Sequence, residues 1–192
     1  MRDMELAADL APRTYTVEEY NVMANAGIFA PDERVELLDG QVIPMPPMGA
    51  AHRTAMRRIQ ARIHEVLGRR ATIATQLPLV ISERSEPEPD FAILRPRDDF
   101  YASGEPAIAD VYAVVEVTDS SSARDRVKKY QLYAQARIPE YWIIGVRDAA
   151  TIDVFREPHD LGYAVCASYT QGDTVAFAAL PDATFAVEEL IA

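Results

Sequence analysis

Two acidic residues and a lysine have the types and the order of a hydrolytic site. Asp90 follows Pro89 directly before an apolar run, Glu116 lies near the end of a longer apolar run, and Lys129 follows on the next predicted helix. Carboxylates completed by waters and substrate oxygens form the kind of shell that Mg²⁺ or Mn²⁺ accepts. A cation held there would act as a Lewis acid on a phosphodiester, while Lys129 would orient the attacking water or neutralise charge on the phosphate. The three residues therefore indicate metal-dependent phosphodiester chemistry.

Glu116 is the most informative of the three because of its surroundings. The run from Val111 to Val117 is otherwise almost continuously apolar, which predicts a central strand of a sheet. An isolated carboxylate is costly to bury in such a strand, so Glu116 must be paired, bound to a metal or exposed at the strand end. Glu36, on a predicted hairpin, is a candidate third acid in the metal shell or a support to it.

The residues alone leave two alternatives open. Lys128 competes with Lys129 for the site, because helical periodicity does not decide which of the two faces the sheet. Asp125 lies four residues before Lys129, a spacing that a simple surface ion pair on a helix also has. Single Asp, Glu and Lys residues are most often solvated or salt-bridged, and that interpretation also stands for this trio.

Local patterns predict the elements that must position these groups. Thr16 followed by Glu19 is a capping box that begins a helix, and Asp39-Gly40 between two apolar runs indicates a β-hairpin. Apolar residues at steps of three and four predict a long amphipathic helix over residues 50–70. A further helix, capped by residues 120–122, is expected to reach about Ala136. We expect strands over residues 35–38, 41–45, 71–81, 91–94, 111–117, 141–146, 151–156, 163–169 and 174–177, the last three as a C-terminal antiparallel meander, and a short final element over 187–192.

Composition bounds the class of protein. The 192 residues suit one domain over residues 14–192 after a flexible N-terminus over 1–13, which lacks the features of an export signal. No apolar run approaches the roughly 18 residues of a membrane span. We therefore expect a cytoplasmic protein with no membrane partner, and Cys166, the single cysteine, is expected simply to pack in an apolar stretch. The net charge of −11 counts against a nucleic-acid partner without excluding one.

The predicted helix over residues 50–70 is basic in this acidic chain. It carries six arginines against one acid: Arg53, Arg57, Arg58, Arg62, Arg69 and Arg70 against Glu65. Such a face suits phosphate contacts, but the arginines are equally explained as solvated side chains or as partners for acids elsewhere. Our candidate substrate contacts are His52, Arg53 and Arg57, together with Gln76 in the strand that precedes Asp90.

The order of motifs resembles the Uma-type restriction endonuclease family of the PD-(D/E)XK superfamily. The resemblance covers most of the chain and is carried by the segments 16–20 (TVEEY), 35–43 (VELLDGQVI), 89–93 (PDFAI), 114–117 (VVEV), 125–129 (DRVKK) and 138–144 (IPEYWII). It implies an α/β (α+β) fold of the restriction-endonuclease-like kind, with a mixed central sheet flanked by helices. The resemblance is to a variant in which the catalytic lysine lies on the helix after the strand. The usual spacing would place the lysine two residues after Glu116, where this sequence has Thr118. Glu36, Asp90 and Glu116 then match the family's acids, and Lys129 matches its lysine.

Two functions from different classes follow. The first is a divalent-metal-dependent endonuclease that hydrolyses phosphodiester bonds in nucleic acid, DNA before others, with Mg²⁺ or Mn²⁺ as cofactor. The second is a noncatalytic nuclease-fold module for binding or oligomeric interaction. The intact set of acids and lysine favours the first and the charge of −11 favours the second. A homodimer is expected for a nuclease that cuts both strands by two-fold symmetry.

Overall fold

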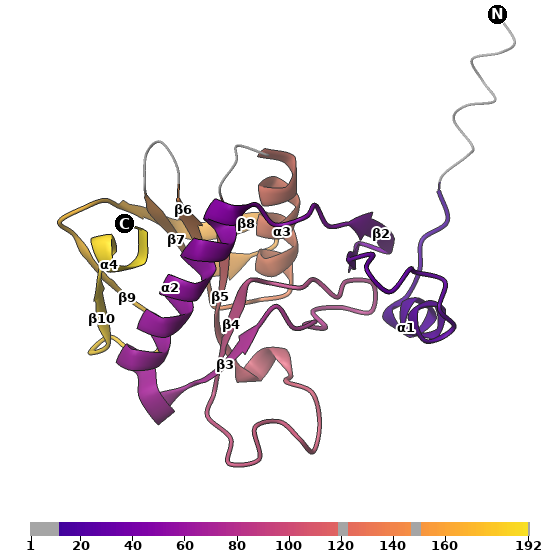
Figure 1. Ribbon diagram of the computed structural model, residues 1–192, viewed down its shortest axis with the longest axis horizontal. Coiled ribbons are helices and arrows are strands. Elements are labelled where there is room, and N and C mark those ends of the chain that lie inside the picture. Colours follow the sequence, from indigo (N-terminus) through magenta and orange to yellow (C-terminus); the bar gives the residue numbers. More distant parts are fainter. Residues whose placement is uncertain (1–11, 119–122, 147–150, 192) are drawn as a thin grey trace, which may run out of the picture.

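A six-stranded mixed sheet forms the centre of the protein, and helices cover both of its faces (Figure 1). The computed structural model describes residues 12–118, 123–146 and 151–191. Within these residues β5 and β6 run parallel and the other neighbouring strands run antiparallel. The strand order is β3 (Thr72–Thr75), β4 (Phe91–Leu94), β5 (Val111–Thr118), β6 (Glu140–Gly145), β7 (Ile152–His159) and β8 (Gly162–Tyr169).

The two faces of the sheet carry different helices. On one face pack α2 (Ala50–Leu67) and α4 (Val187–Ile191), and on the other packs α3 (Ala123–Gln135). Successive side chains of a strand point to opposite faces, so Val115 packs with α2 whereas Val114 packs with α3. Glu116 follows Val114 by two residues and therefore projects toward α3. The fold class that the sequence predicted, a mixed sheet flanked by helices, is confirmed.

An arm built from α1 (Val17–Asn25) and a β-hairpin extends to one side of the sheet (Figure 1). The predicted capping box is present, since the Thr16 hydroxyl accepts from the Glu19 N–H and the Glu19 carboxylate accepts from the Thr16 N–H. The hairpin pairs β1 (Val35–Leu38) with β2 (Gln41–Pro44). Its turn residues, Asp39 and Gly40, both have positive φ, as the Asp-Gly pattern predicts.

Two predicted strands differ from the structure. The strand expected over residues 71–81 ends at Thr75, because Gln76 adopts a left-handed conformation with φ 50° and Pro78 follows. The strand expected over 174–177 does not extend the meander. As β9 (Thr174–Ala176) it pairs with β10 (Thr184–Ala186) in a separate two-stranded sheet, so the antiparallel meander consists of β6, β7 and β8.

Three smaller predictions have separate outcomes. Cys166 was expected to be packed but is exposed on β8, because this edge strand is poorly covered there and residues 164–166 are all exposed. The cap expected over residues 120–122 lies outside the described residues. No helix in the described ranges has the length and apolar character needed to cross a membrane.

Candidate active site

The two strand acids come together where β4 and β5 pair. Phe91 of β4 lies opposite Val115 of the antiparallel β5, so the next position of the same register places Asp90 beside Glu116. Asp90 stands directly before β4, and Glu116 lies two residues before the end of β5. The structure therefore brings both predicted strand acids to one end of the sheet.

Lys129 reaches these acids from α3. Its Nζ lies 3.0 Å from Glu36 Oε2 and 3.1 Å from Glu116 Oε1, and the side chain is 11% exposed. The neighbouring Lys128 points elsewhere and donates to Gln41 Oε1 on β2, at 3.2 Å. Of the two lysines that periodicity left open, Lys129 is thus the one that contacts the acids.

Glu36 enters the site from the hairpin arm. It is buried on β1, and its Oε2 accepts a hydrogen bond from the Glu88 N–H at 3.2 Å. Two backbone hydrogen bonds between Leu37 and Glu86, of 2.8 and 3.3 Å, attach β1 to the segment that leads into β4. This attachment holds the third acid within reach of Lys129.

Asp90 is held on both carboxylate oxygens. The Val117 N–H donates to Oδ2 at 2.8 Å, and the Gln76 side chain donates to Oδ1 at 3.2 Å. His52, near the start of α2, places Nε2 3.4 Å from the same Oδ1. Gln76 therefore lies beside Asp90, just past β3 rather than within a strand, and its role as a substrate contact stays a prediction. The hydrogen bond from Val117 ties the carboxylate directly to the backbone of β5.

Tyr133 is a site residue that the sequence reading missed. Its hydroxyl donates to Glu116 Oε1 at 2.9 Å, and its side chain is fully buried. Its spacing of four residues from Lys129 places both side chains on one face of α3, and that spacing was the available signal.

Burial and crowding of charge determine the ionisation of the site. The pKa of Glu116 is raised to about 7, first because burial disfavours the charged carboxylate; Lys129 opposes the rise, while Asp90 and Glu36 add to it. Burial alone would lower the pKa of Lys129, but the charges of Glu116 and Glu36 outweigh it and raise that pKa above the ordinary lysine value. The pKa of Tyr133 is raised well above its ordinary value, by burial and then by Glu116, so its hydroxyl is a hydrogen-bond donor.

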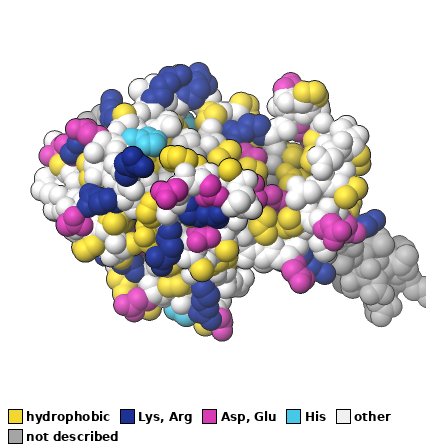
Figure 2. Space-filling view, turned by 90° about the horizontal axis from the view of Figure 1, so that it is seen from below, with side chains coloured by type: hydrophobic (Ala, Val, Ile, Leu, Met, Phe, Trp, Pro, Cys, Tyr) yellow, Lys and Arg dark blue, Asp and Glu magenta, His cyan; other side chains and the backbone are white. Residues whose placement is uncertain are grey.

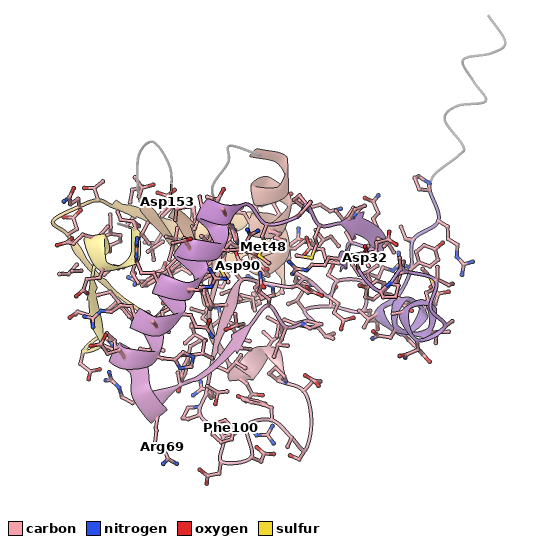
Figure 3. The ribbon with its side chains drawn as sticks, viewed as in Figure 1. Asp32, Met48, Arg69, Asp90, Phe100 and Asp153 are labelled. Atoms are coloured by element: carbon pink, nitrogen blue, oxygen red, sulfur yellow. The ribbon has the colours of Figure 1, made fainter. Side chains whose placement is uncertain are left out.

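These side chains line a cavity of about 200 Å³ between the sheet, the hairpin and the start of α2. Glu36, Asp90, Glu116 and Lys129 are among its polar lining residues, and residues 45–49 of the connection from β2 to α2 line it as well. Figure 3 labels Asp90 and Met48 close together at the centre of the molecule, and Gln76 Nε2 lies within 3.2 Å of atoms of both. The cavity brings the ammonium of Lys129 and these three carboxylates to one small volume, and the fourth acid of its lining, Glu88, pairs with Arg34.

The carboxylates of this site suit a divalent cation that is bound by two of them and completed by waters. In the described ranges no group of three or more His, Cys, Asp or Glu side chains is already arranged to hold a metal ion. However, among the described residues Glu116 Oε2 and Glu36 Oε1 accept no hydrogen bond. One lysine also leaves the negative charge of three buried acids only partly neutralised. Mg²⁺ keeps several waters and needs few protein ligands, so Asp90 and Glu116 suffice as its anchors.

The arginines of α2 and of the short 3-10 helix that follows it (Gly68–Arg70) divide into two groups. Toward the end of the helix, Arg62 pairs with Glu65 and Glu189, and Arg70 pairs with Asp182. Nearer the cavity, Arg53 donates to the Met48 carbonyl and is exposed, as are Arg57 and Arg58. Among the described residues these three arginines form no ion pair. Arg69, which follows the C-terminal end of α2, forms none there either. Partnership with acids, one of the two alternatives considered, therefore holds for Arg62 and Arg70.

Comparison with known proteins adds two findings and one negative result. The Uma2 family, described as "Putative restriction endonuclease", has a model that matches residues 17–188. A crystal structure titled as a "putative nuclease belonging to DUF820" from Anabaena variabilis is similar with a TM-score of 0.69. The two chains are 16% identical, and the match covers 91% of this chain and 96% of that one, which supports a shared fold. No curated protein sequence matches.

Proposed function

Because the chain belongs to the Uma2 restriction endonuclease family, we propose that it is a nuclease that hydrolyses phosphodiester bonds in nucleic acid, with DNA as the first substrate to test. One observation carries the proposal: three acids and one lysine from four separate elements converge on a single cavity. An ammonium 3.0 to 3.1 Å from two carboxylates, beside a third, is a group set that can support metal-assisted hydrolysis.

Mg²⁺ or Mn²⁺ is the proposed cofactor. Asp90 and Glu116 would hold it, and Glu36 would supply a third oxygen ligand or support the other two. The bound cation would supply Lewis-acid activation of the phosphodiester and of a water. The Val117 N–H and Gln76 keep the Asp90 carboxylate in one orientation, so little reorganisation is needed on binding.

Lys129 is the proposed group for the water or the phosphate. The charges of Glu116 and Glu36 raise its pKa, so the side chain stays protonated. A protonated lysine at this position neutralises the charge that grows on the phosphate, or donates a hydrogen bond that orients the attacking water. A Lys129→Ala variant would therefore lose the positive charge and the hydrogen-bond donor that the reaction needs.

The first turns of α2 are the proposed substrate contact. Arg53 and Arg57 are exposed and stand four residues apart on one side of the helix, directly after His52 of the cavity wall. Figure 2 shows that basic and acidic side chains lie interspersed on the face seen from below, so the net charge of −11 does not make that face uniformly acidic. Phosphate contacts of this kind give affinity without sequence preference.

A cleavage assay tests the catalytic proposal. Purified protein is incubated with supercoiled, linear and single-stranded DNA and with RNA, in Mg²⁺ or Mn²⁺ at low salt. Lys129→Ala should abolish cleavage and keep Mn²⁺ binding, whereas Lys128→Ala should cleave like the wild type. If only the Lys128 variant lost cleavage, the reactive lysine would be Lys128, and the assignment to Lys129 would be wrong. Asp90→Ala should lose Mn²⁺ binding in calorimetry, and unchanged binding would remove Asp90 from the metal shell.

A salt titration tests the substrate contact separately. We expect replacement of Arg53 and Arg57 by serine to weaken binding of a fluorescent DNA duplex in EDTA. It should also lower the slope of log affinity against log salt by up to about 2. Arg69→Ser is the matched control, since Arg69 is also exposed but lies just past the end of α2, far from Asp90 (Figure 3). Equal slopes in the double variant and the control would exclude Arg53 and Arg57 as the substrate contact.

A noncatalytic binding module is the second candidate. The observation in its favour is that Lys129 forms ion pairs with two of the acids, which gives these carboxylates a structural partner within the protein. Mn²⁺ or nucleic-acid binding without cleavage of any substrate, in protein shown to be folded, would select it. We also propose a homodimer, which light scattering would distinguish from the monomer mass of 21.3 kDa.

A further inference from the structure

Tyr133 connects the aromatic core beneath α3 to the acid pair. Its hydroxyl donates to Glu116 Oε1 at 2.9 Å, and its ring centroid lies 5.1 Å from that of Tyr141. We propose that Tyr133 is a positioning residue, which fixes Oε1 of Glu116 and thereby turns Oε2 toward the cavity to receive the cation. This inference rests on the proposed metal-dependent function.

The geometry at Glu116 favours positioning over simple satisfaction of a buried hydroxyl. Lys129 Nζ and the Tyr133 hydroxyl both donate to Oε1, at 3.1 and 2.9 Å. Two donors on one oxygen restrict rotation of the carboxylate plane about the side-chain bond. Among the described residues nothing donates to Oε2, although Glu116 lines the cavity. The free oxygen is therefore the one available to a ligand.

Tyr133 suits this task better than the lysine does. Lys129 divides its ammonium between Glu116 and Glu36 on a flexible four-carbon stem, and the proposed reaction needs it to turn toward the phosphate. Tyr133 is 0% exposed, its ring is confined by Tyr141, and Glu116 is its hydrogen-bond acceptor. The tyrosine therefore keeps Glu116 in place while the lysine moves.

Removal of a single oxygen atom tests the proposal. Tyr133→Phe keeps the ring and its packing, and we expect Mn²⁺ affinity in calorimetry to fall by about 10-fold or more, as for other partners of metal ligands. Tyr163→Phe is the matched control. Its hydroxyl is also buried in the core under α3 and donates to the Ile138 carbonyl at 3.1 Å, away from the acids. This variant loses a comparable hydrogen bond and should bind Mn²⁺ like the wild type.

A crystal structure of metal-free Tyr133→Phe gives a second readout that does not depend on the metal. We expect the Glu116 carboxylate to rotate or to occupy two conformers, with no such change in Tyr163→Phe. Wild-type Mn²⁺ affinity in Tyr133→Phe would overturn the positioning role while leaving the nuclease proposal intact. If the wild type binds no Mn²⁺, the metal proposal fails, and the crystal structure alone decides: a displaced Glu116 supports positioning by Tyr133, and an unmoved one refutes it.

Discussion

Binding of Mn²⁺ should release a proton at pH 6 and almost none at pH 8. Burial raises the pKa of Glu116 to about 7. About 0.9 of these carboxyls are then protonated at pH 6 and about 0.1 at pH 8. A carboxylate must lose its proton to bind a metal, so the released fraction equals the protonated fraction. In consequence the Mn²⁺ affinity should rise about 10-fold per pH unit below pH 7 and become level above it.

Titration calorimetry in two buffers measures this release. At each pH the two buffers titrate near that pH, bind Mn²⁺ weakly and differ in their enthalpy of ionisation, so the difference between the observed heats gives the number of protons released. We expect about 0.9 at pH 6 and about 0.1 at pH 8. Glu116→Gln is the control and should bind more weakly with no such proton release. Equal heats in both buffers at pH 6 for the wild type would show that Glu116 is already ionised, and the argument from burial would be wrong.

Three further variants test the fold. Arg156→Ala should lower the free energy of unfolding in urea by about 3–5 kcal/mol, because it leaves the buried Glu140 carboxylate without its charged partner at 2.8 Å. Gly162→Ala should cost about 1–3 kcal/mol in the same assay, since the added Cβ would lie 2.6 Å from the Tyr130 hydroxyl. Thr16→Ala should cost about 1 kcal/mol of local stability in α1, detected as faster amide exchange there, because it removes the capping hydroxyl.

Matched controls separate these effects from general sensitivity to mutation. Arg137→Ala removes a pair with Asp160, whose side chain is 84% exposed, and should cost at most about 1 kcal/mol. Gly172 also has a positive φ, but a Cβ added there would have no neighbour within 4 Å. Gly172→Ala therefore measures the cost of backbone strain without the clash that Gly162→Ala makes with Tyr130. If Arg137→Ala destabilised as much as Arg156→Ala, burial would not be the reason for the larger cost.

Local chemistry made much of the fold predictable. The Thr16 and Glu19 capping box and the Asp39-Gly40 turn act over a few residues, and the structure has both as predicted. Glu116 was identifiable because a carboxylate in an apolar strand needs a partner, and the structure supplies Lys129 and Tyr133.

What the sequence did not decide depends on tertiary contacts. The choice between Lys128 and Lys129 follows from the rotation of α3 against the sheet, and a shift of one residue along a helix turns a side chain by about 100°. Gln76 lies in a segment of strand-like composition, but its left-handed φ ends β3 there and directs its amide to Asp90. Cys166 is apolar in type but lies on an edge strand, where burial depends on what covers the sheet.

The four groups of the cavity come from β1, the start of β4, β5 and α3, in the order in which the ribosome makes them. A nascent chain that has emerged only through β4 carries Glu36 and Asp90 but lacks both Glu116 and Lys129. Asp90 also lacks the N–H of Val117 that orients it until β5 has paired. The proposed site is therefore assembled only after α3 has been synthesised and has packed against the sheet, and shorter nascent chains lack it.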